Sequence, residues 1–503
     1  MNYLELLHAT LPETVLEIAA LAVLVVDLAF LRNAAQKTRA AVAALLGVIG
    51  CGVALWAVGI APALSYGNSL LLASGGSAGV AQCGVLVLTA LTLLLLIDAE
   101  FTRNPGEFVA VVLMSAAGGL IISAAQDLLV IFIGLELLSL GLYVLTAFAK
   151  KSGRSAEAAI KYYLFGGMSA AFLLFGFSYL YGLSGSTSLP QVVLGAYAAS
   201  ANGGSPLLYV ALVMVAAGLG FKVAAVPFHL WAPDAYEGAP APAAAFIASV
   251  SKVASFALLI SIGSAALRVI EGLPAINPGL GSVWGVSFGW PLVLMVLAVA
   301  SMVLGNLTAL AQTSVRRLLA YSAIAHAGYI LLGLAFYSHS DRSAQAVLYY
   351  ILTYGLTTIG AFGVVGVVER ATGSDRLDAF LGLQKRNPVL AAVLLILLLS
   401  LAGIPPLVGF WAKFNLFAAV LAVGGGAAPF TLVALAVAFS AVSLYYYIQV
   451  LKRAYVMPGA DESPIRAHPV TMAVLVAIAA AVLALGCLPA LLQNWIAGFY
   501  PGM

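Results

Sequence analysis

Long uninterrupted apolar runs recur along the whole of this 503-residue sequence, and they constrain its fold more than any other feature. A run of about 18 or more such residues can cross a bilayer core of about 30 Å as a helix. With 63% hydrophobic and only 8% charged residues, the chain also lacks the polar residues that would cover a soluble domain. The sequence therefore predicts an all-α, polytopic membrane protein.

About fourteen membrane-spanning helices are predicted, and they follow one another from end to end of the chain. They are expected near residues 12–31, 40–60, 81–99, 107–125, 128–148, 158–183, 206–231, 241–267, 290–311, 317–337, 344–368, 388–422, 430–452 and 469–495. The connections 61–80 and 184–205 are uncharged and rich in Gly and Ser, which is typical of short external loops. We interpret residues 1–503 as a single membrane domain.

Basic residues are distributed unevenly among the predicted loops. Loops after even-numbered helices carry only Arg268 and Arg342. Loops after odd-numbered helices carry sixteen of the 22 Lys and Arg residues: Arg32, Lys37, Arg39, Arg103, Lys150, Lys151, Arg154, Arg316, Arg317, Arg370, Arg376, Lys385, Arg386, Lys452, Arg453 and Arg466. By the positive-inside rule the odd-numbered loops are cytoplasmic, which predicts that both termini lie on the outer, periplasmic side.

The stretch 218–242, GLGFKVAAVPFHLWAPDAYEGAPAP, combines a charge with a helix break inside the seventh predicted span. Lys222 would cost about 2.5 to 3.5 kcal/mol at the bilayer centre on insertion scales, and Pro227 removes a backbone donor. His229 follows the proline. Such groups are tolerated where they face a bundle interior or a water-filled cavity. The stretch therefore predicts a charge-handling centre inside the bundle.

The twelfth predicted span, LAGIPPLVGFWAKF, has a similar combination, because Pro405 and Pro406 precede Lys413. The two broken spans lie five helices apart, so they would cross the membrane in opposite directions. This is the geometry of an inverted repeat. We expect helices four to eight (106–268) to repeat as helices nine to thirteen (289–456), with helices one to three (1–105) before them and a last helix (469–495) after them.

Glu136 lies near the middle of the fifth predicted span, with Ser139 and Tyr143 on the same helical face. A buried carboxylate is costly unless a cation pairs with it, and Lys222 is the candidate partner. One interpretation is a structural salt bridge. The other lysines within spans favour a path for protons or ions.

Further ionisable residues extend this set. Lys252 lies within the eighth span among serines, whose hydroxyls can complete a water chain. Lys161 either belongs to the path or reaches the interface beside Glu157, one turn earlier. His229 and His326 are either satisfied core residues or members of the path. Asp234 and Glu237 are expected in solvent at a cytoplasmic helix end.

The sequence lacks the common motifs for binding nucleotides, zinc or iron–sulfur clusters. We find no Walker A motif and no dinucleotide-binding GxGxxG motif after a strand. Cys51, Cys83 and Cys487 stand apart, without the spacing of zinc or iron–sulfur ligands. We therefore expect no cofactor, metal or nucleic acid on this chain, so any redox centre would lie on other chains.

These motifs together resemble the antiporter-like subunits of respiratory complex I. The resemblance rests on the Glu136 helix, on GFKVAAVPFHLWAPDAYEGAP, SVSKVASF, RRLLAYSAIAHAGY and LAGIPPLVGFWAKF, and covers nearly the whole chain. The opening LPETVLEIAALAVLVVDL and a lysine in the twelfth span favour the subunit N branch.

The resemblance implies a proton-pumping role in NADH:quinone oxidoreductase, driven by quinone reduction elsewhere in the complex. It implies that Glu136 and Lys222 are a coupling pair, that Lys252 is the central relay and that Lys413 lies near the periplasmic exit. Lys161 and His229 match further positions of the hydrophilic axis, and His326 stays a possible relay group.

The resemblance also implies where the chain works and with what. FMN, iron–sulfur clusters and quinone would be bound by partner subunits. The partners would be a neighbouring antiporter-like subunit, small membrane subunits and the lipid of a bacterial inner membrane. Alternatives are an ion-transport subunit of a multisubunit Na+/H+ antiporter or membrane-bound hydrogenase, a solute carrier, and an inert scaffold.

Overall fold

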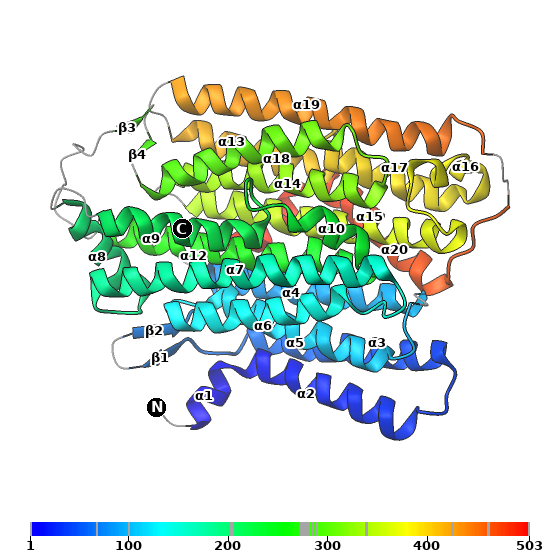
Figure 1. The fold of residues 1–503 in the computed structure, drawn as a ribbon, viewed down its shortest axis with the longest axis horizontal. Coiled ribbons are helices and arrows are strands. Elements are labelled where there is room, and N and C mark those ends of the chain that lie inside the picture. Colours follow the sequence, from blue (N-terminus) through cyan, green and yellow to red (C-terminus); the bar gives the residue numbers. More distant parts are fainter. Residues whose placement is uncertain are drawn as a thin grey trace.

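The protein is a bundle of roughly aligned helices (Figure 1). A computed structural model describes residues 3–66, 69–98, 101–201, 206–271, 282–283, 286–287, 289–337, 341–423, 427–459 and 463–500. Within these residues, twelve helices are long and apolar enough to cross a membrane. The predicted all-α membrane fold is confirmed.

The elements of the first half run from α1 to α12. They are α1 (Tyr3–Ala9), α2 (Leu11–Val25), the π-helical turn η1 (Val26–Phe30), α3 (Gln36–Val58), β1 (Leu64–Tyr66), β2 (Ser69–Leu72), α4 (Gly76–Leu95), the 3-10 turn η2 (Leu96–Asp98), α5 (Pro105–Ala124), α6 (Leu128–Thr146), α7 (Gly153–Ser184), α8 (Leu189–Ala201), α9 (Pro206–Val223), α10 (Trp231–Gly238), α11 (Ala241–Ala248) and α12 (Val250–Glu271).

The second half continues with two short strands and nine helices among the described residues. They are β3 (Ser282–Val283), β4 (Val286–Ser287), α13 (Trp290–Ala309), α14 (Val315–Ala335), α15 (Asp341–Thr372), the 3-10 turn η3 (Leu377–Phe380), α16 (Leu383–Arg386), α17 (Pro388–Ala402), α18 (Val408–Ala422), α19 (Ala427–Tyr455), α20 (Pro469–Cys487) and α21 (Pro489–Ala497).

Two predicted spans are helical but interrupted, and neither is among the twelve. The span predicted at 12–31 is α2 followed directly by η1. The span predicted at 388–422 is divided into α17 and α18. The count of about fourteen spans and the inverted repeat stay predictions.

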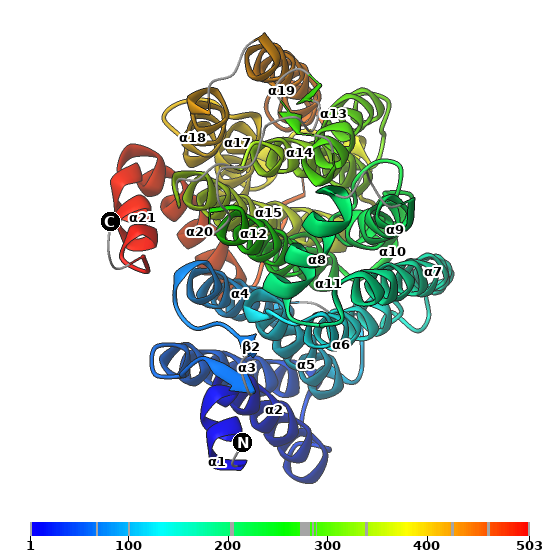
Figure 2. The same ribbon diagram turned by 90° about the vertical axis from the view of Figure 1, so that its left-hand side faces the viewer.

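The most buried helices lie at the centre of the bundle. In α14 and in the span formed by α11 and α12, 94% of the apolar window is buried, against 33% in α7 and in α19. Figure 2, which looks along the helices, shows α12, α14 and α15 surrounded by the others. A polar group on α12 or α14 is therefore far from lipid and needs a partner inside the protein.

The break between α9 and α10 is held by side-chain hydrogen bonds. The backbone N–H of Val226 donates to Ser301 Oγ on α13 at 2.9 Å. The indole N–H of Trp231, the first residue of α10, donates to the Phe221 carbonyl at 2.9 Å. These bonds satisfy backbone groups that the break removes from the helical pattern.

The break between α17 and α18 depends on two glycines. Gly403 ends α17 with a φ of +87°, a conformation that L side chains rarely adopt. At Gly409 an added Cβ would lie 1.8 Å from the Ser400 carbonyl oxygen. Glycine therefore allows the second half of the broken helix to lie against the first. Both predicted breaks are present.

Three local predictions were incomplete. The eighth span is not continuous, because Ser249 separates α11 from α12 with φ −115° and ψ −73°. The connection predicted at 61–80 contains the antiparallel β1–β2 hairpin, whose Leu64 and Leu72 are buried. The connection predicted at 184–205 contains α8. The side chain of Arg268 and residues 272–281 lie outside the described residues.

The two ends of the described chain lie at the same end of the bundle. Helix α1 packs against β1, and the Phe499 carbonyl, just after α21, accepts a hydrogen bond from Gly76 N at 3.0 Å. Gly76 begins α4, directly after the hairpin. We call this the hairpin end. The loops rich in Lys and Arg lie at the opposite end (Figure 1), which we call the basic end.

Candidate functional site: a buried row of lysines

Lys222 lies in the last turn of α9, with 5% of its side chain exposed. Its ammonium donates to Ser139 Oγ on α6 at 2.8 Å. Glu136, one turn before Ser139, is half-buried, and within the described residues its carboxylate makes no hydrogen bond and no ion pair shorter than 4 Å. The direct Glu136–Lys222 contact that the sequence suggested is therefore absent, because the Ser139 hydroxyl occupies the position next to the ammonium.

His229 lies in the break between α9 and α10, and 6% of it is exposed. Among the described residues, no hydrogen-bond partner faces its Nδ1 atom. A buried ring nitrogen without a protein partner is a suitable position for a bound water. His229 lies within the break that follows Lys222, whereas the sequence suggested a position just beyond it.

Lys252 lies in the first turn of α12, just after the break at Ser249, and it is buried. Its ammonium donates to the Ala323 carbonyl of α14 at 2.5 Å and lies 5.7 Å from the centre of the Tyr354 ring. An ammonium over an aromatic face is attracted by the ring quadrupole. Within the described residues, no carboxylate pairs with Lys252.

Lys413 follows the second break, on α18, and its ammonium has three oxygen partners. It donates to the carbonyls of Leu401 and Ala402 at 3.0 and 2.8 Å and to Ser440 Oγ at 2.8 Å. These carbonyls end α17, where the helix dipole is negative. The broken helix thus provides the electrostatic partner of its own lysine.

His326 connects the surroundings of Lys252 and Lys413. Its ring lies 4.9 Å from the Tyr354 ring, which faces Lys252, and 5.8 Å from the Tyr329 ring. The Lys413 ammonium lies 5.5 Å from the centre of that Tyr329 ring. A further hydrogen bond of 2.8 Å joins His326 Nδ1 to the Tyr350 hydroxyl. The structure therefore places His326 between two of the predicted relay lysines.

A cavity of about 10 Å³ lies between His326 and the second break. That volume is close to the space that one water needs. Its polar lining includes His326, Tyr350, Thr353, Thr357 and Ser400. These hydroxyls and the imidazole can supply the two to four partners that an ordered water requires.

An ion-pair network fixes α10 at the basic end. Arg317 of α14 contacts Asp234 at 2.6 Å and Glu237 at 2.9 Å. Lys161 of α7 contacts Asp234 at 2.8 Å and Glu157 at 2.7 Å. Asp234 and Glu237 are thus paired across helices, and the expectation that they are simply solvated was wrong. More than 70 residues of sequence separate Asp234 from Lys161, and Asp234 and Glu237 from Arg317, so no local pattern could have paired them.

The charge of Asp234 is set by this network. Asp234 lies outside the twelve candidate spans. Burial favours its neutral form, but the Lys161 ammonium and the Arg317 guanidinium outweigh burial and hold the pKa of Asp234 below its ordinary value. Asp234 therefore stays ionised and keeps α10 attached to α7 and α14.

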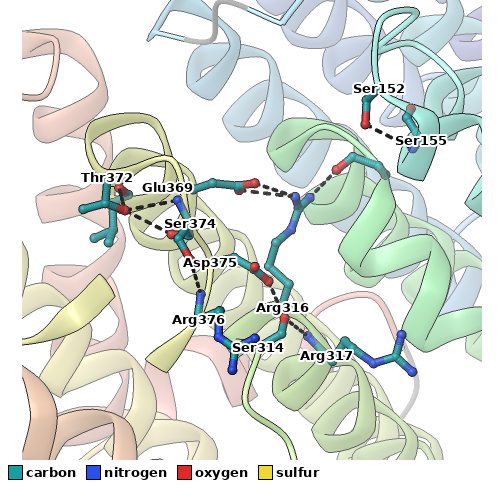
Figure 3. Close-up of polar contacts among 12 residues, drawn as sticks. Ser152, Ser155, Ser314, Arg316, Arg317, Glu369, Thr372, Ser374, Asp375 and Arg376 are labelled. Atoms are coloured by element: carbon teal, nitrogen blue, oxygen red, sulfur yellow. Dashed lines mark hydrogen bonds and ion pairs between the residues drawn. The ribbon is translucent and has the colours of Figure 1, made fainter. Parts of the chain in front are cut away.

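Arg316 lies beside this network and joins α15 to the turn before α11 (Figure 3). It is 4% exposed, contacts Glu369 at 3.2 Å and donates to the Ala239 carbonyl. Close by, Ser314 donates to Asp375 (Figure 3). In the sequence, Arg316 and Arg317 served only to predict which side of the membrane their loop lies on. The contacts of Arg316 with α15 and with the turn before α11 were therefore not predicted.

A cavity of about 420 Å³ opens beside Arg316 at the basic end. Its charged lining residues are Asp98, Arg154, Glu237, Arg316, Glu369, Arg370 and Asp375. Charges of both signs favour water over an apolar ligand in this cavity. The bundle that holds the buried lysines therefore has an opening with a charged lining at its basic end.

Comparison with known proteins gives consistent matches. Residues 125–276 and 279–440 match the family described as "NADH:quinone oxidoreductase/Mrp antiporter, TM". NADH-quinone oxidoreductase subunit N 2 of Acidobacterium capsulatum is 47% identical over 507 residues, which cover 99% of each chain.

Two solved structures extend this comparison. A chain of respiratory complex I from Thermus thermophilus is 33% identical with a TM-score of 0.75, over 96% of this chain and 98% of that one. A chain of the Mrp complex from Dietzia has a TM-score of 0.76 over 98% and 96% of the two chains. It is 22% identical, so the likeness concerns the fold alone.

Proposed function

This chain belongs to the subunit N family of NADH-quinone oxidoreductases, and from that premise we propose that it carries protons across the membrane through its buried lysines. The observation that carries the proposal is the set Lys222, Lys252 and Lys413, each buried and each bonded to neutral oxygens. An ammonium that forms no ion pair with a carboxylate gains less from its charge than a salt-bridged one. Such a group can release and accept a proton.

Proton movement is proposed to run along the row. Protons reach the row from the cavity beside Arg316, and His326 passes them between Lys252 and Lys413 through the tyrosines and the water-sized cavity. Glu136, with Ser139 as intermediary, changes the charge next to Lys222 and so couples this chain to its neighbour. Lys161, which contacts Asp234 of α10, and His229, in the break before α10, are proposed as further members of the same proton path.

The energy for this movement comes from other chains. We place FMN, the iron–sulfur clusters and the quinone in partner subunits, as the resemblance implies, and the three separate cysteines of this chain lack the spacing of iron–sulfur ligands. The partners are other membrane subunits of the complex. We place the protein in a bacterial inner membrane, with the basic end in the cytoplasm and both termini in the periplasm.

The first test is purification through an affinity tag on this chain after mild detergent extraction. Co-purification of NADH:quinone reductase activity with flavin and iron–sulfur absorbance is expected. Purification of other hydrophobic chains alone, with Na+-dependent transport after reconstitution, would support the alternative of an Na+/H+ antiporter or membrane-bound hydrogenase subunit.

The second test is Lys222→Ala. We expect quinone reduction and proton pumping both to fall about tenfold or more, because coupled steps stop together. The complex should still assemble. Lys151→Ala, which changes an exposed lysine in the loop after α6, is the control and should leave both rates unchanged. Normal pumping by an assembled Lys222→Ala complex would refute the relay.

A further inference from the structure

A second large cavity, of about 750 Å³, lies at the hairpin end, and none of the three buried lysines is in its lining. It is formed by the first turns of α15, the last turns of α18, and α21. Its hydrogen-bonding lining includes Arg342, Gln345, Asn415, Gln493 and Asn494. None of the described residues that line it is Asp or Glu. One arginine and several amides without a carboxylate form a site for an anion.

Helix α21 indicates the depth at which the cavity opens. Its polar residues Gln493 and Asn494 line the cavity, while Leu491 and Trp495 are 59% and 42% exposed. Trp is enriched where membrane and water meet, and a short helix with one apolar and one polar face lies in that interface. The cavity therefore opens at the level of lipid headgroups.

Arg342 has a position that membrane topology alone does not favour. It is one of two basic residues on the loops after even-numbered helices, where positive charge is otherwise absent. It is exposed in this chain and lines the cavity. A phosphate group would give it the bidentate partner that guanidinium geometry suits.

We propose that this cavity binds the phosphate headgroup of an anionic phospholipid from the leaflet at the hairpin end. Arg342 contacts the phosphate, the amides of Asn415, Gln493 and Asn494 donate to its remaining oxygens, and the acyl chains lie along the exposed apolar residues of α21. The site is independent of the proton path, because it shares none of the relay residues.

The test uses the whole complex that purifies with this chain, delipidated in detergent. Dioleoyl phosphatidylglycerol is titrated in, and the retained lipid is counted by native mass spectrometry. Arg342→Gln is expected to weaken retention about ten- to hundredfold, as the loss of a charge-assisted contact does. Asn494→Leu, which replaces a lining amide by an apolar side chain of similar size, should weaken it several-fold. Arg376→Gln, an exposed arginine at the basic end, is the control and should change nothing.

Competition identifies the ligand. Excess dioleoyl phosphatidylcholine should not displace the bound lipid, and inorganic phosphate should displace it only weakly. Equal retention of the two lipids, or equal retention by the wild-type and Arg342→Gln complexes, would overturn the proposal. Inorganic phosphate that competes as well as the lipid would assign the site to a free anion instead.

Discussion

At the scale of single residues, the buried lysines share an unusual set of partners. Lys252 bonds a backbone carbonyl and Lys413 bonds two carbonyls and a hydroxyl, and neither pairs with a carboxylate among the described residues. Removing a charge from water costs several kcal/mol, which dipoles offset only in part. The ammonium and the neutral amine are therefore closer in free energy than at the surface, as a proton carrier requires.

Ser139 tests the contact next to Lys222. Ser139→Ala removes the hydroxyl that accepts from the ammonium, and a hydrogen bond to a charged group contributes about 1.5 to 3 kcal/mol. We expect proton pumping to fall about tenfold, measured by dye quenching in vesicles. Ser123→Ala is the matched control, because its buried hydroxyl bonds only the Gly119 carbonyl of its own helix. Equal effects of the two substitutions would contradict a specific role for Ser139.

The sequence identified the lysines but not their partners. A charge within an apolar run is visible without any structure, and Lys222, Lys252 and Lys413 are indeed buried. Their partners lie on other helices, such as Ser139 for Lys222 and the Ala323 carbonyl for Lys252. Such contacts depend on helix packing and rotation, which the amino-acid pattern does not specify.

At the scale of elements, the broken helices were predictable where proline marks them. The breaks near Pro227 and Pro405 were expected from the loss of backbone donors. The break at Ser249 has no proline, and α8 and the β1–β2 hairpin lie in stretches that have the composition of loops. Tertiary packing decided these three elements.

Arg317 tests how α10 is held. Arg317→Gln removes its two ion pairs from α10, leaving Lys161 on Asp234. The groups are partly exposed, so we expect a loss of about 1 kcal/mol in local stability. Hydrogen–deuterium exchange of residues 231–238 should be about fivefold faster than in the wild type, and its rate should depend less on salt. Arg376→Gln, which changes an exposed arginine at the same end, is the control. Equal exchange in the two variants would show that the Arg317 ion pairs do not hold α10 in place.

Gly409 tests the second break. In Gly409→Ala the new methyl group would overlap the Ser400 carbonyl, so α18 must move away from α17. Overpacking of this kind costs about 1 to 3 kcal/mol. We expect a lower thermal midpoint of the purified complex and reduced pumping, because Lys413 lies one turn further on. Gly52→Ala, where a Cβ would meet nothing within 4 Å, should be neutral.

At the scale of the whole molecule, the charge distribution makes a topological prediction. In a Cys487→Ser background, Ser65→Cys in β1 and Lys151→Cys after α6 place single exposed thiols at opposite ends. A membrane-impermeant maleimide should label Ser65→Cys in intact spheroplasts, but Lys151→Cys only after the membrane is opened. The reverse result would invert the orientation.

The half-buried Glu136 has a consequence for biogenesis. Its carboxylate lies on a helix face where Ile133 and Leu140 are more than half exposed, and no described residue of the chain forms an ion pair with it. A newly inserted copy would therefore present an acid to lipid, at a cost that falls only when a neighbouring membrane chain covers it. Copies that have not assembled should be short-lived, because the half-buried carboxylate destabilises the isolated chain in the bilayer. The same cost favours rapid assembly with the neighbouring membrane subunit.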